Sequence, residues 1–239
     1  MPHPRVPLGV GFYTRGDAAR FLRMRPDRIN RWVRGYSYSW KVAQDKRHGR
    51  QPPVIKTDLP LLEDTLTLSF LELMELRVVK EFLDQGIPLQ TVRVAWRHAA
   101  HAFQTGHPFA HHRVFLDKGQ IFMALDNATA PDLMEVSSRQ RPFQVIAGPI
   151  FARSVKELEF DEKTLFVRRW WPLGLQVPVV LDPRIAFGAP VIEGTRIPTE
   201  IVGLHLRTRS VEQVAKAFEV DRPRVEAART FESRLAQAA

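Results

Sequence analysis

The side chains best suited to chemistry lie in one short basic segment, residues 25–34 (RPDRINRWVR). Its spacing predicts a helix with Ile29, Trp32 and Val33 on one face and polar groups on the other. Arginine can bind guanine O6 and N7 with two hydrogen bonds, and asparagine can bind adenine in the same way. The segment therefore predicts a recognition helix for the major groove of DNA, and a solvated basic helix is the competing interpretation. The side chains expected to contact DNA are Arg25, Arg28, Asn30, Arg31 and Arg34.

The next segment, residues 36–58, begins with alternating aromatic and basic side chains and predicts a β-hairpin, or wing, with residues 46–50 near its tip. A basic wing can follow the phosphates or enter the minor groove. The cations expected to contact DNA there are Lys41, Lys46, Arg47 and Arg50. We expect one or two of the aromatic residues Tyr36, Tyr38 and Trp40 to form the core of the hairpin.

The net charge of +9 comes from the beginning of the chain. Residues 1–56 hold 13 lysines and arginines but 3 acids, a net charge of +10, whereas the remaining 183 residues sum to −1. Such a local excess of positive charge is typical of proteins that bind a polyanion. Nucleic acid is the favoured partner, and a membrane surface is disfavoured because no basic amphipathic helix stands alone.

Other kinds of chemistry are poorly supported. The chain has no cysteine, which excludes disulfides, thiolate nucleophiles and cysteine zinc sites. It has no nucleophile elbow, phosphate loop or zinc-protease motif, so we expect neither an enzyme nor a cofactor. No apolar run approaches the ~20 residues of a membrane helix, and we expect a cytoplasmic protein.

A group of histidines could in principle hold a metal ion. It comprises His98, His101, His107, His111 and His112. No aspartate or glutamate lies between residues 98 and 112 to complete a site, so we expect surface and loop histidines without a metal.

The elements that position these residues are expected to be mainly helices. A helix capped by Thr14 and Asp17 precedes the helix that starts at Pro26 and stops at Gly35, which is a helix-turn-helix pattern. Further helices are predicted over residues 70–85, 88–103, 198–206, 211–218 and from 222, and a hairpin around residues 117–120. We expect Glu72 to complete a capping box with Ser69, and Glu75 to complement the helix dipole.

The expected fold is therefore α+β and mainly α. Residues 1–125 would form a winged helix-turn-helix domain, residues 126–175 a strand-rich connection, and residues 176–239 a trihelical domain that itself resembles a helix-turn-helix. Because helix-turn-helix repressors usually bind paired half-sites, we expect a homodimer.

A second candidate surface is the run Arg168, Arg169, Trp170 and Trp171. Tryptophan and arginine are enriched at interface hot spots, so this run is a candidate partner-binding anchor. The alternative, equally supported by the sequence, places one tryptophan in the core and the other at a domain seam.

Two stretches near the C-terminus, residues 182–199 (DPRIAFGAPVIEGTRIPT) and 210–215 (SVEQVA), resemble the antitoxin domain of a branch of VapB-like antitoxins. The N-terminal half resembles the winged helix-turn-helix that some of these antitoxins carry, which is similar to MerR-type DNA-binding domains. That likeness rests on Tyr13-Thr14, Ala18-Ala19 and residues 31–36 (RWVRGY), 69–73 (SFLEL) and 106–109 (GHPF).

The resemblance implies an antitoxin of a type II toxin–antitoxin pair. Such a protein neutralises a PIN-like ribonuclease toxin by binding it and represses its own operon by binding operator DNA. Two alternatives stay open. The chain could be a stand-alone MerR-like regulator that senses a small ligand through its C-terminal half, or an interaction module whose basic face binds an acidic toxin.

Overall fold

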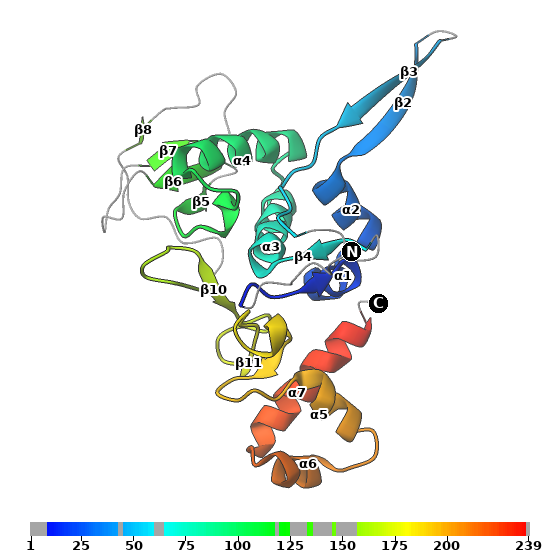
Figure 1. Cartoon of the computed structure of the whole chain (residues 1–239), viewed down its shortest axis with the longest axis vertical. Coiled ribbons are helices and arrows are strands. Elements are labelled where there is room, and N and C mark those ends of the chain that lie inside the picture. Colours follow the sequence, from blue (N-terminus) through cyan, green and yellow to red (C-terminus); the bar gives the residue numbers. More distant parts are fainter. Residues whose placement is uncertain are drawn as a thin grey trace, which may run out of the picture. The chain divides into compact units, whose positions relative to one another are not determined.

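The computed structural model describes residues 9–42, 45–59, 65–117, 120–124, 133–135, 145–146 and 157–237. Their elements are α-helices and short antiparallel strands (Figure 1), which confirms the predicted α+β, mainly α class. Among these residues no helix is both long enough and apolar enough to cross a membrane.

These residues form two compact units, each assembled from segments that are distant in the sequence. The first contains the described parts of Met1–Met24, Leu59–Leu71 and Val155–Ala239, and the second those of Arg25–Asp58 and Glu72–Ser154. The three continuous domains expected from the sequence, with boundaries after residues 125 and 175, stay a prediction.

Three helices close the first unit, as the C-terminal pattern predicts. They are α5 (Thr199–His205), α6 (Val211–Phe218) and α7 (Arg222–Gln237), and Figure 1 shows α5 and α6 lying against α7. The predicted capping box is present at the start of α6, where Ser210 and Gln213 each accept a hydrogen bond from the other's backbone N–H. Their shared core consists of Ile192, Val202, Val214, Val225 and Ala228, all fully buried.

The same unit holds helix α1 (Arg15–Leu22), which starts at the capping box of Thr14 and Asp17 that the sequence predicts. Phe21 of α1 packs against Phe231 of α7, with ring centroids 6.4 Å apart. The strands of this unit are antiparallel pairs: β1 (Tyr13–Thr14) with β4 (Thr67–Leu68), β9 (Leu158–Phe160) with β10 (Val167–Trp170), and β11 (Val179–Val180) with β12 (Val191–Ile192).

A tight turn of left-handed backbone, η2 (Ala186–Gly188), is hydrogen-bonded to the segment that contains β1. Its three residues have φ angles of 47°, 55° and 87°. The buried hydroxyl of Tyr13 donates a hydrogen bond to the Gly188 carbonyl at 2.8 Å. A Cβ atom at position 188 would lie 2.2 Å from that hydroxyl, so only glycine fits there.

The second unit contains α2 (Pro26–Arg34), the hairpin of β2 (Tyr36–Val42) and β3 (Asp45–Gln51), all but the first two residues of α3 (Phe70–Asp84), α4 (Leu89–Phe103) and the turn η1 (Pro108–Ala110). An antiparallel sheet follows in the order β5 (Val114–Asp117), β6 (Gln120–Ala124), β7 (Leu133–Glu135) and β8 (Val145–Ile146). Each predicted helix and both predicted hairpins are therefore confirmed. Figure 1 shows the β2–β3 hairpin, the predicted wing, extending away from α3 and α4.

Candidate nucleic-acid interface

Helix α2 presents its basic side chains to solvent. Ile29, Trp32 and Val33 are buried on the opposite face, which confirms the predicted division of the helix into two sides. Arg25, Arg28, Arg31 and Arg34 are exposed, and Asn30 lies half-buried at the edge of the apolar face. By the helical period, Arg31 and Arg34 lie near the middle of the exposed side, opposite the buried face.

The start and the end of α2 are set by two restricted residues. Pro26 occupies the first turn, where its missing N–H costs nothing. Gly35 ends the helix with a φ of 73°, and a Cβ there would lie 2.3 Å from the Gln51 carbonyl oxygen. Beyond the wing, the Val54 N–H donates to the Trp32 carbonyl at 2.6 Å. Both strands of the wing are thus tied to the C-terminal end of α2.

The wing places its aromatic side chains on one face and most of its basic side chains on the other, with Arg47 as the exception. In an antiparallel pair, directly opposed residues point to the same face and neighbours along a strand alternate. The register opposes Trp40 to Arg47 and Lys41 to Lys46. The aromatic face therefore carries Tyr36, Tyr38, Trp40 and Arg47, and the basic face carries Ser37, Ser39, Lys41, Lys46, His48 and Arg50.

None of the three aromatic side chains of the wing is buried, so the expectation that one or two of them form a hairpin core is wrong, although Tyr36 is half-buried. Tyr38 and Trp40 are 41% and 42% exposed, because a two-stranded ribbon has no second layer to bury them. Their rings stack with centroids 5.3 Å apart and lie over Gly49, where a Cβ would meet Tyr38 at 2.8 Å. The Arg31 guanidinium lies 5.4 Å from the centre of the Tyr36 ring, so the first aromatic residue of the wing contacts a side chain of α2.

The basic face places like charges beside one another. Lys41 and Lys46 are direct cross-strand neighbours close to the tip, an arrangement that is unfavourable unless an anion compensates it. Arg50 pairs with Ser37 near the base of the wing, so the predicted position near the tip is correct for Lys46 and wrong for Arg50.

Most cations of this region are not neutralised within the part of the chain that the structure describes. Arg25 forms an exposed ion pair with Asp27 at 3.1 Å. The remaining seven predicted DNA-contacting cations have no ion-pair partner among the described residues; they are Arg28, Arg31, Arg34, Lys41, Lys46, Arg47 and Arg50. A polyanion is the partner that such a surface suits.

Below this surface, a buried polar network fixes the segment that follows the wing. The fully buried Glu75 of α3 accepts hydrogen bonds from the Trp96 indole at 2.8 Å and the Phe109 N–H at 3.2 Å. One His107 nitrogen lies 3.2 Å from Glu75 and the other 2.7 Å from Asp58. Burial opposes protonation of the imidazole, but Glu75 and then Asp58 raise the pKa of His107 to about 9.

This network corrects two expectations. Glu75 is buried and does not complement the helix dipole at the surface. Glu72 is also fully buried and accepts a hydrogen bond from the Asp58 N–H, and its capping box with Ser69 stays a prediction. His107 and His111 are buried and not surface residues. Among the described residues no three histidine, aspartate or glutamate side chains gather in a way that could hold a metal ion.

The run at residues 168–171 has no exposed aromatic side chain. Trp170 and Trp171 are only 4% and 5% exposed, so both are packing residues. The alternative drawn from the sequence placed one of them in the core and the other at a domain seam. Arg168 pairs with Glu159 at 3.0 Å, and Arg169 pairs with the buried Asp182 at 3.0 Å. A role of this run in partner binding stays a prediction.

Comparison with known proteins supports the assignment of this surface. Residues 11–96 match the family described as "Putative DNA-binding HTH domain", and residues 179–231 match "Protein of unknown function (DUF433)". The fold is similar to the crystal structure of Rv2018 from Mycobacterium tuberculosis, with a TM-score of 0.59, 18% sequence identity and coverage of 93% of this chain and 99% of that chain. No curated protein sequence matches the chain. The first match spans α1, α2, the wing and α3 and extends into α4, and it supports DNA binding by this part of the chain.

Proposed function

We propose that this chain is the antitoxin of a type II toxin–antitoxin pair, which neutralises a PIN-like ribonuclease and represses its own operon. The observation that carries the DNA-binding part is the set of seven exposed, unneutralised cations on α2 and the wing, two consecutive elements of one unit. Duplex DNA supplies the closely spaced negative charges that compensate them.

Within this proposal, α2 and the wing have separate tasks. α2 lies in the major groove, where Arg28, Arg31 and Arg34 reach base edges or phosphates and Asn30 reaches an adenine at the groove floor. The basic face of the wing follows the adjacent phosphates. The buried network around Glu75 keeps the segment after the wing in place, so the cations meet the duplex as a preformed surface.

The toxin-binding part of the proposal has a different support. It rests on the resemblance of residues 182–199 to the VapB-like antitoxin domain, within the region that matches DUF433. In this proposal the chain neutralises its toxin by binding and has no catalytic activity of its own. The protein acts as a homodimer on paired operator half-sites.

The test is co-expression with the product of the adjacent gene, followed by nuclease treatment, purification and native mass measurement. The proposal predicts a complex of both proteins that survives nuclease treatment and shifts a fragment of its own promoter in a gel. A chain that binds the promoter but retains no partner would favour the stand-alone regulator. A complex that forms without any binding to the promoter would favour the pure interaction module.

A further inference from the structure

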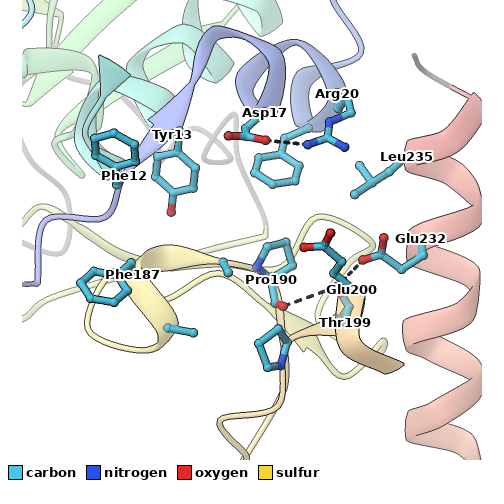
Figure 2. Close-up of a pocket in the computed structure, with 14 residues that line it drawn as sticks. Phe12, Tyr13, Asp17, Arg20, Phe187, Pro190, Thr199, Glu200, Glu232 and Leu235 are labelled. Atoms are coloured by element: carbon cyan, nitrogen blue, oxygen red, sulfur yellow. Dashed lines mark hydrogen bonds and ion pairs between the residues drawn. The ribbon is translucent and has the colours of Figure 1, made fainter. Parts of the chain in front are cut away.

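The first unit contains a pocket that none of the DNA-binding residues uses. It has a volume of about 510 Å³, within the range of sites for small organic ligands. Figure 2 shows that it lies between α1 on one side and η2, α5 and α7 on the other. Side chains from both matched regions, residues 11–96 and 179–231, therefore face the same space.

The acids of this pocket outnumber its bases. Asp17 and Arg20 pair with each other at 2.6 Å, which leaves Glu200 and Glu232 without an ion pair among the described residues. Figure 2 shows both of these carboxyl groups on the same side of the pocket, and Thr199 donates a hydrogen bond to Glu232 at 2.5 Å. Burial raises the pKa of Glu232, and the charge of Glu200 raises it further, against the hydrogen bond from Thr199 and the charge of Arg20. A positive group between them would relieve this repulsion.

The other walls are apolar and partly aromatic. Phe12, Phe21, Pro190 and Leu235 line the space, and none of them is a charged or hydrogen-bonding side chain. Phe187 at the rim is 64% exposed, an unusual state for phenylalanine, and the left-handed turn around it holds it there. An apolar body that covered Phe187 would gain the free energy of that burial.

We propose that this pocket binds a small organic cation, an ammonium or guanidinium group carried on an apolar body. The cation lies between Glu200 and Glu232, and the body lies against the apolar walls formed by α1, η2 and α7. An anionic ligand would be repelled by the two carboxylates, and a purely apolar ligand would cover them without supplying a positive charge, although Glu232 keeps its hydrogen bond from Thr199. The combination of charge and apolar surface selects the amphipathic cation.

The experiment is calorimetric titration of the full chain, without DNA, with 2-phenylethylamine and with its neutral analogue 2-phenylethanol. We expect saturable binding of the amine and binding of the alcohol that is weaker by about tenfold or more, the loss expected when a charged hydrogen-bonding group is removed. The variants Glu200→Gln and Glu232→Gln should each weaken amine binding by a similar factor. The matched control Glu193→Gln, a half-buried glutamate of the same unit outside the pocket, should leave it unchanged.

A further variant guards against misfolding of the glutamine variants. Phe187→Ala removes an exposed side chain, so the thermal unfolding temperature should stay unchanged. The affinity for both the amine and the alcohol should fall. The proposal is overturned if the alcohol binds as tightly as the amine, if both glutamine variants bind the amine like the wild type, or if no saturable binding occurs. Because the titration contains no DNA and no toxin, its result is independent of the proposed antitoxin function.

Discussion

The opposed lysines of the wing allow the DNA-binding surface to be tested by charge alone. Lys41 and Lys46 are cross-strand neighbours on the basic face and have no ion-pair partner among the described residues. Replacing both with alanine removes two positive charges without breaking a described contact. Because like charges opposite one another are unfavourable, the double variant should fold at least as stably as the wild type.

The expected effect follows from counterion release. Each phosphate neutralised on duplex DNA contributes about −0.9 to the slope of log K against log salt concentration. If all seven unneutralised cations of α2 and the wing contact phosphates, the slope is roughly −6.3 per protomer, and loss of two contacts brings it to roughly −4.5 per protomer. The affinity should fall for all sequences alike, since phosphate contacts carry no base information.

The assay is a fluorescence anisotropy titration of a promoter fragment at four or more salt concentrations, with a random duplex in parallel. The matched control is the double variant Lys163→Ala, Lys216→Ala, which removes two exposed lysines of the other unit. Circular dichroism confirms that each variant folds. An unchanged slope for the Lys41, Lys46 variant, or an equal reduction for the control, would refute the assignment of the wing to the phosphate backbone.

Three further predictions concern α2, the buried network and the turn at Gly188. Arg31→Ala should cost about 1–3 kcal/mol of promoter affinity and relax specificity if it binds a base, whereas Arg229→Ala on α7 should cost nothing; a gel-shift titration with equal affinities would exclude Arg31 from recognition. His107→Ala removes the positive partner of the buried Glu75, which keeps only its hydrogen bonds from Trp96 and Phe109, and should lower the free energy of unfolding by about 3–5 kcal/mol at pH 6. Protonation of His107 stabilises the fold below about pH 6.5 and is lost as the pH rises through about 9, so urea unfolding should show a smaller difference from the wild type at pH 9, and a constant difference would contradict the pairing. Gly188→Ala should lower the thermal unfolding temperature more than Gly194→Ala. Both glycines have positive φ, but only at position 188 would a Cβ lie 2.2 Å from the Tyr13 hydroxyl. Equal losses would show that backbone strain alone accounts for the destabilisation.

Much of the local structure could be predicted from the sequence because its causes lie within a few residues. Thr14 and Asp17 cap α1, and Ser210 and Gln213 cap α6; in each pair the two residues are three apart and bond to each other's backbone N–H groups. Pro26 occupies the first turn of α2. The apolar face of α2 follows from the 3.6-residue period in the same way. The exposed cations on its other side were therefore predictable before any tertiary contact was known.

The arrangement of the wing shows where this reasoning stops. The alternation of aromatic and basic residues predicts a hairpin, but a shift of one residue in register would change which side chains share a face. The register that opposes Trp40 to Arg47 decides that Tyr38 and Trp40 stack in the open. The surface that DNA would meet is thus a property of the pairing between strands.

By itself, the sequence determined the helices, their caps, the basic segment and the fold class of this protein. Only the tertiary structure decided that Glu75 and His107 share a buried network, that Trp170 and Trp171 are core residues, and that Glu232 faces a pocket. The physical reason is the distance along the chain between the partners. A helix cap joins residues three apart, whereas Glu75 meets His107 across 32 residues and Thr199 meets Glu232 across 33, and no short-range pattern records which distant group compensates a buried charge.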